Sequence, residues 1–156
     1  MNTNSSPIIS TKDKKAYSGY VVDLNKKYQV KLAAVEGSTE KPLPSEPAPF
    51  IDGSKTSDFG GWLCIREGKG RLFHHLGRLT CRYRKANVFS LVGLIKKKKI
   101  DLGALWLEAN KEEFILDLKQ HFKNQTGQEK LYLFMNDCIF FYFNNRGYYS
   151  IELNET

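Results

Sequence analysis

Apolar residues come in short runs along most of the chain, and these runs predict strands rather than long helices. The N-terminal part gives two strands, Gly19–Leu24 and Tyr28–Val35, which we expect to form a hairpin through a turn at residues 25–27. Val88–Ile95 is a mainly apolar run, as is typical of a buried strand. Three further strands are expected at Trp62–Arg66, Arg71–Leu76 and Arg78–Arg84.

The C-terminal part predicts a meander of three strands. They are expected at Lys130–Met135, Cys138–Phe143 and Tyr148–Leu153, with a two-residue turn at Asn136-Asp137 between the first two. Aromatic residues fall on both faces of this meander. One face therefore packs on a helix, and the other needs a cover or a partner.

One segment, at about 110–124, has the periodicity of an amphipathic helix. Asn110 is a suitable N-cap, and Glu113 completes a pattern like a capping box. The segment Ile100–Leu107 stays open between strand and short helix, because periodicity does not separate the two at that length. The apolar stripe of the predicted helix consists of Phe114, Ile115, Leu118 and Phe122.

Residues 36–58 hold four of the five prolines and predict a long proline-rich surface loop, because proline lacks a backbone donor and fixes φ. Residues 1–15 are polar and lysine-rich and predict a flexible tail. We therefore expect a single α+β domain over residues 16–156. It would be a mainly antiparallel sheet or partial β-barrel, packed by the one amphipathic helix.

Composition bounds the class of protein. A chain of 156 residues with 41% hydrophobic residues has enough apolar material for one core, which excludes wholesale disorder. It has no apolar run near the roughly 20 residues of a transmembrane segment. Three cysteines without a CxxC pair predict neither a disulfide framework nor a zinc site, so we expect no metal and no cofactor. Without a secretory signal, we expect a cytoplasmic protein, or a nuclear one in a eukaryote.

The net charge of +7 is concentrated in one segment. Between Arg66 and Lys99 there are eleven Lys and Arg residues and one acid, Glu67, so this segment carries +10 and the rest of the chain −3. Such asymmetry favours an anionic partner: nucleic acid, an anionic membrane surface or an acidic protein.

Within this segment, the predicted strand Arg78–Arg84 places alternate arginines on one face. The arginine fork matches phosphate groups, and neighbouring aromatic rings are suited to stacking bases. The run Lys96–Lys99 has a simpler alternative as an exposed turn between two apolar segments. The candidate anion-binding residues are Lys69, Arg71, Phe73, Arg78, Arg82, Tyr83, Arg84, Lys85, Lys96, Lys97, Lys98 and Lys99.

Catalytic patterns are weak. His74 and His75 are adjacent, so on a strand they point to opposite faces and cannot ligate one metal. A nucleophile pair of Cys81 with His75 stays open, because such partners meet in space rather than in sequence. The sequence has neither a GxSxG motif nor a dinucleotide fingerprint, so we predict no catalytic residue.

The fragment Leu131–Tyr142, LYLFMNDCIFFY, is similar to a strand–turn–strand found in some pleckstrin homology domains. The resemblance implies phosphoinositide or protein binding. It covers about a dozen of the 156 residues. The helix predicted here precedes these strands, whereas that family ends with its helix, so we assign no family.

Together these patterns predict a non-enzymatic binding module whose basic Arg66–Lys99 surface engages an anionic partner, nucleic acid first. A second hypothesis is a protein–protein interaction module (an inhibitor, an immunity protein or a subunit of a complex) that uses the aromatic sheet at residues 130–153. A third is peripheral binding to an anionic membrane through the lysine run. A fourth is a small hydrolase or nuclease that uses His74 or His75.

Overall fold

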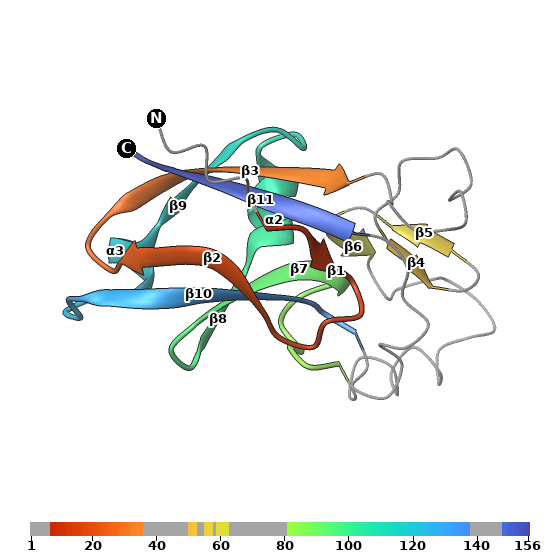
Figure 1. Cartoon of the computed structure of the whole chain (residues 1–156), viewed down its shortest axis with the longest axis horizontal. Coiled ribbons are helices and arrows are strands. Elements are labelled where there is room, and N and C mark those ends of the chain that lie inside the picture. The colour runs from red at the N-terminus through yellow and green to blue at the C-terminus, as the bar shows by residue number, and fades with distance from the viewer. Residues whose placement is uncertain (1–6, 36–49, 53–54, 58, 63–80, 138–147) are drawn as a thin grey trace.

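The computed structural model describes residues 7–35, 50–52, 55–57, 59–62, 81–137 and 148–156. Most of these residues lie in strands, and the helices are short (Figure 1). The elements are β1 Ile9–Ser10, β2 Ala16–Asp23, β3 Lys27–Val35, β4 Phe50–Asp52, β5 Lys55–Ser57, β6 Gly60–Trp62, β7 Val88–Ile95, β8 Lys98–Asp101, α2 Leu102–Glu108, β9 Phe114–Asp117, α3 Leu118–His121, β10 Gln128–Met135 and β11 Tyr148–Glu155.

Two antiparallel sheets face each other, one above the other in Figure 1. The first has the strand order β1–β11–β3–β9. The second has the order β2–β10–β7–β6, with β8 also paired to β7, and β4 and β5 pair with each other. The predicted class, α+β with mainly antiparallel strands, is confirmed. Among the described residues the two sheets do not close into a barrel.

Side chains from both sheets build one core. Leu131 and Leu133 of β10 belong to the same buried cluster as Val30 of β3 and Ile151 of β11. Helix α2 adds Leu102 and Trp106 to this cluster. The Trp106 ring stands edge-on to the Phe59 ring, with the centroids 5.2 Å apart. The helix in this core therefore comes from the segment whose type the sequence left open.

The prediction of a helix at about 110–124 is wrong. Asn110 and Lys111 have φ of 54° and 67°, so the chain leaves the helical conformation after α2, and Asn110 ends a helix instead of beginning one. Over β9, Phe114 and Leu116 are buried while Ile115 is 50% exposed, which is the alternation of a strand. Only residues 118–121 are helical, with Asp117 as their N-cap.

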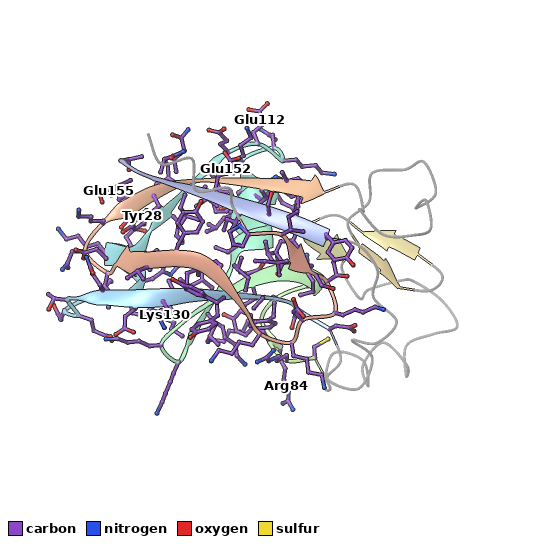
Figure 2. The ribbon with its side chains drawn as sticks, viewed as in Figure 1. Tyr28, Arg84, Glu112, Lys130, Glu152 and Glu155 are labelled. Carbon is purple, nitrogen blue, oxygen red and sulfur yellow. The ribbon has the colours of Figure 1, made fainter. Side chains whose placement is uncertain are left out.

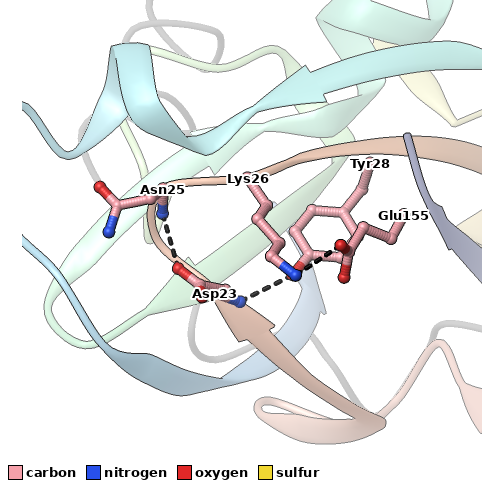
Figure 3. A network of polar contacts seen from close by, with 5 residues as sticks. All are labelled: Asp23, Asn25, Lys26, Tyr28 and Glu155. Carbon is pink, nitrogen blue, oxygen red and sulfur yellow. Dashed lines mark hydrogen bonds and ion pairs between the residues drawn. The ribbon is translucent and has the colours of Figure 1, made fainter.

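Strands β2 and β3 do not form the predicted hairpin, because they belong to different sheets. The chain turns a corner between them, which Figure 3 shows in detail. The Asn25 backbone N–H donates to Asp23 Oδ1 at 2.9 Å, and the Asp23 N–H donates to Tyr28 Oη at 2.7 Å. Lys26 Nζ meets Glu155 Oε1 at 2.5 Å. These contacts hold the corner against the end of β11. The hydrogen bond from Lys26 to Glu155 raises the pKa of Lys26.

The predicted meander is also wrong. Both edges of β10 are occupied, by β2 and β7, and β11 lies in the other sheet between β1 and β3. Ile9–Ser10 of the predicted tail form β1, and the predicted proline-rich loop contains the pair β4–β5. The strands predicted at Arg71–Leu76 and Cys138–Phe143 lie outside the described residues.

Candidate functional site

The outer face of the second sheet carries a row of side chains that crosses four strands. Tyr17 of β2 is opposite Tyr132 of β10, Tyr132 is opposite Leu94 of β7, and Leu94 is opposite Lys99 of β8. Leu131 and its alternate neighbours point into the core, so these residues point away from it. Neighbouring strands lie about 4.8 Å apart, so the row is about 14 Å long.

We refer to this surface as the basic–aromatic face. Its rings alternate with cations that lie close to them. Figure 2 shows Lys130 on β10 and Arg84 on the same lower side of the molecule, away from Glu112, Glu152 and Glu155. The face consists of Lys15, Tyr17, Arg82, Tyr83, Lys99, Lys130 and Tyr132.

At one end of the row, two tyrosines and two lysines form a compact cluster. The rings of Tyr17 and Tyr132 have centroids 5.8 Å apart and are tilted by 52°. Lys15 Nζ lies 4.2 Å from the centre of the Tyr132 ring, and Lys130 Nζ lies 5.6 Å from that of Tyr17. Tyr17 is 42% exposed. These are cation–π distances, which orient the lysines without neutralising them.

A β-bulge in β2 places Tyr17 opposite Tyr132. Val21 pairs with Lys130 and Tyr17 pairs with Tyr132, so β2 has two more residues than β10 between these pairs. Gly19, with φ of 84°, lies in the bulge. The buried Ser18 hydroxyl donates to the Leu131 carbonyl at 2.8 Å, which satisfies an acceptor next to the bulge. Local irregularity of this kind re-aims a side chain on a sheet.

At the other end, residues 82–87 lie over the sheet as an irregular segment, so the predicted strand Arg78–Arg84 does not extend through Arg82. Ala86 of this segment packs on Phe134 and Val92 in a second, small apolar cluster. The cluster covers apolar side chains that the outer face of the sheet would otherwise expose.

The buried side chain of Asn136 fixes this segment. Its Oδ1 accepts from the Tyr83 N–H at 2.8 Å, and its Nδ2 donates to the carbonyls of Tyr83, Ala86 and Asn87 at 2.9, 3.1 and 2.8 Å. Asn136 and Asp137, which were predicted as a two-residue turn, are both buried. Asparagine matches both donors and acceptors of the backbone, which explains its use here.

Arg82 and Lys99 lie beside each other. Lys99 Nζ donates to the Arg82 carbonyl at 2.7 Å and lies 5.9 Å from the centre of the Tyr83 ring. The Arg82 guanidinium covers the Phe134 ring at 4.3 Å, and its buried Nη1 has no hydrogen-bond partner. Burial, followed by the charge of Arg82, lowers the pKa of Lys99.

These cations form no ion pair with a carboxylate in the part of the chain that the structure describes. Among the described residues the ion pairs are Lys26–Glu155, Lys27–Asp117 and Lys96–Glu129, and none involves Lys15, Arg82, Lys99 or Lys130. Two acids lie nearby: Asp137, whose carbonyl accepts from the Arg82 N–H at 3.3 Å, and Asp101. Asp101 Oδ1 accepts from the Ser90 hydroxyl and, at 3.0 Å, from the Ala104 N–H, so it caps α2. Burial raises the pKa of Asp101.

The lysine run is divided between two places. Lys96 and Lys97 form the exposed turn between β7 and β8, as the simpler alternative for this run predicted. Lys98 Nζ donates to the His121 carbonyl and lies 5.3 Å from the centre of the Phe122 ring. Burial lowers the pKa of His121, and the positive charge of Lys98 lowers it further. An open hollow of about 770 Å³ is lined by Lys96, Lys97, Lys98, Phe122 and Gln125.

The structure thus brings together only part of the predicted site. Arg82, Tyr83 and Lys99 meet, while Arg84 and Lys85 are exposed beside them in the same segment. His74 and His75 lie outside the described residues, whereas Cys81 is buried. Four predicted residues also lie outside the described ranges: Lys69, Arg71, Phe73 and Arg78.

Sequence reasoning missed the tyrosine end of the face. Lys130 and Tyr132 alternate with the apolar Leu131 and Leu133, which predicts their outward direction. The bulge that brings Tyr17 beside Tyr132 has no comparable signal, because β2 and β10 are more than a hundred residues apart in the chain.

Other kinds of site have no support in the described part of the chain. It contains no group of three or more His, Cys, Asp or Glu residues that would hold a metal ion. No helix in the same residues is long and apolar enough to cross a membrane. Comparisons with known proteins give no match, whether with family models, curated proteins or solved structures.

Proposed function

We propose that the protein is a non-enzymatic module that binds nucleic acid through the basic–aromatic face. The observation that carries the proposal is the pair of neighbouring cations, Arg82 and Lys99, which have no carboxylate partner among the described residues. Two like charges at close range destabilise the free protein. A bound phosphate group beside them would offset this cost.

The extent of the charged surface favours a polymer over a small anion. Arg84 and Lys85 extend the pair on one side, and Lys130 and Lys15 lie toward the other end of the same sheet face. A series of separated cations is suited to a series of separated phosphates. Aromatic side chains among them are a further feature of nucleic-acid surfaces built on sheets.

The alternative of a protein partner for the aromatic C-terminal strands has less to support it. Phe134 and Tyr149 are fully buried, and they belong to different sheets. Tyr132 is the aromatic residue of β10 that stays partly exposed on the outer face, and it lies among lysines. The membrane alternative used Lys96–Lys99, of which Lys96 and Lys98 have local partners. Both alternatives stay open as outcomes of the experiment.

The test is fluorescence anisotropy of labelled single-stranded RNA and of duplex DNA, titrated with the protein at several salt concentrations. We expect binding that weakens steeply as salt is added, because phosphate contacts release counterions. Arg82→Gln and Lys99→Gln should each reduce the slope of log K against log salt by about 0.7 to 0.9.

The matched control is Lys31→Gln, which removes one exposed lysine from β3 in the opposite sheet. It should leave both affinity and slope unchanged. Absence of binding at low salt would refute the proposal, and so would an equal effect of Lys31→Gln. Co-sedimentation with anionic vesicles in place of nucleic acid would favour the membrane alternative, and capture of a protein without nucleic acid would favour the second hypothesis.

A further inference from the structure

The tyrosine cluster presents aromatic surface as well as charge. Tyr17 is 42% exposed. It lies opposite Tyr132 because β2 departs from regular pairing with β10. Val21 beside them is 51% exposed. Exposed apolar surface of this kind is unfavourable in water unless a ligand covers it.

The charges around the cluster restrict the ligand. Lys15 and Lys130 lie over the two rings at 4.2 and 5.6 Å, and within the described ranges neither has a carboxylate partner. A ligand that fits this cluster therefore combines flat apolar groups with regularly placed anionic groups. A nucleic-acid strand has this combination, with bases for the rings and phosphates for the ammonium groups.

The state of the bases distinguishes a single strand from a duplex. In a duplex the faces of the bases are stacked on one another, and only their edges and the phosphates are accessible from outside. A single strand offers unstacked bases, which lie on aromatic side chains. Tyrosine rings on the outer surface of a sheet are therefore suited to stacking with the bases of a single strand and not with those of a duplex.

We propose that the basic–aromatic face binds single-stranded nucleic acid along the row from Tyr17 to Lys99, with bases stacked on Tyr17 and Tyr132. Phosphates would then contact Lys15 and Lys130 at one end and the Arg82–Lys99 pair at the other. This inference rests on the proposed function, because it specifies the strand state of the same ligand. It assigns to Tyr17, Tyr132 and their lysines a role that charge alone does not predict.

The experiment compares a labelled oligothymidylate with a DNA duplex of the same length, by anisotropy at one low salt concentration. Tyr17→Ala and Tyr132→Ala should each weaken binding of the single strand by about 5- to 150-fold, the range of one lost stacking contact. Their salt slopes should stay at the wild-type value, because no phosphate contact is lost. Tyr17→Phe retains the ring and should bind as the wild type does.

The control for loss of exposed apolar surface is Ile115→Ala. Ile115 is 50% exposed on β9, in the other sheet, and its removal should leave binding unchanged. Circular dichroism of each variant separates lost binding from lost folding.

The outcomes separate the two proposals. Binding of the duplex as tight as that of the single strand, with no effect of Tyr17→Ala, would overturn the inference and leave the proposed function in place. Failure of the wild-type protein to bind either probe would overturn both. An equal loss on Ile115→Ala would also overturn the inference.

Photo-crosslinking of wild-type protein to a 4-thiothymidine oligonucleotide gives a test that needs no substitution. Crosslinks in the segments that contain Tyr17 or Tyr132 would support the inference. Crosslinks confined to β3 or β11 would overturn it, since these strands belong to the opposite sheet.

Discussion

Asn136 shows how much one side chain organises. Its amide is fully buried and bonds to the backbone of three residues, Tyr83, Ala86 and Asn87, about fifty positions earlier in the chain. These bonds hold the segment that carries Arg82 and Tyr83 against the sheet. An alanine here would remove the partner of the Tyr83 N–H and of the buried Ala86 carbonyl, whereas the Tyr83 and Asn87 carbonyls also accept from the N–H groups of Ala86 and Ser90.

We expect Asn136→Ala to lower the free energy of unfolding by about 2 to 4 kcal/mol, because each unsatisfied buried group costs about 1 to 3 kcal/mol. Urea denaturation measures this change. Asn154→Ala, at an exposed position of β11, is the control and should stay within about 0.5 kcal/mol of the wild type. A cost for Asn136→Ala as small as that of the control would contradict the role assigned to the amide.

At this scale, the sequence predicts residue chemistry better than residue position. Asn136 was expected in a two-residue turn, whereas its amide bonds to backbone about fifty positions earlier in the chain. Arg82 and Lys99 were both expected to contact an anion, yet their proximity depends on how β8 and the segment 82–87 pack. Contacts across such distances have no local signal.

At the scale of elements, the bulge in β2 depends on Gly19 for two reasons, its positive φ and its close approach to Pro7. Gly19 has φ of 84°, which residues with a side chain rarely adopt. A Cβ at this position would lie 3.1 Å from Cδ and Cγ of Pro7, closer than ordinary contact. Gly127 has φ of 109°, but a Cβ there would meet nothing within 4 Å. Alanine substitutions at the two glycines therefore distinguish the cost of backbone strain from the cost of steric crowding.

We expect Gly127→Ala to cost about 1 to 2 kcal/mol from backbone strain alone. Gly19→Ala should cost more, because the contact with Pro7 adds to the same strain, and it should also weaken single-strand binding by displacing Tyr17. Thermal unfolding and anisotropy measure the two effects. The account of the bulge fails if Gly19→Ala is as stable as Gly127→Ala and binds as the wild type does.

The strands were largely predictable because their signal is local. Val88–Ile95 is confirmed as β7, and the strands predicted at Tyr28–Val35 and Lys130–Met135 lie within β3 and β10. The helix at 110–124 was wrong because its apolar residues satisfy two periods at once. Positive φ at Asn110 and Lys111 and the pairing of β9 with β3 decide in favour of the strand. Neither is visible in a pattern of apolar residues.

At the scale of the whole molecule, the two sheets have different outer surfaces but one core. The outer face of the second sheet carries cations that form no ion pair with any described residue, together with exposed or partly exposed tyrosines. Lys31 on the other sheet is opposite Glu152 of β11. Leu133 of β10 lies in the same buried cluster as Val30 and Ile151, so the strand that carries Tyr132 is supported by side chains of the opposite sheet.

This shared core predicts that the two sheets unfold together. Leu133→Ala should lower the free energy of unfolding by about 2 to 5 kcal/mol, as expected for a truncated core leucine. Hydrogen exchange should then show that slow amides in β3 lose protection by the same factor as those in β10, although the substitution lies in β10. Ile115→Ala, at an exposed position, should leave both sets unchanged. If the amides of β3 kept their protection in Leu133→Ala, the sheets would unfold independently, and the binding face would rest on the second sheet alone.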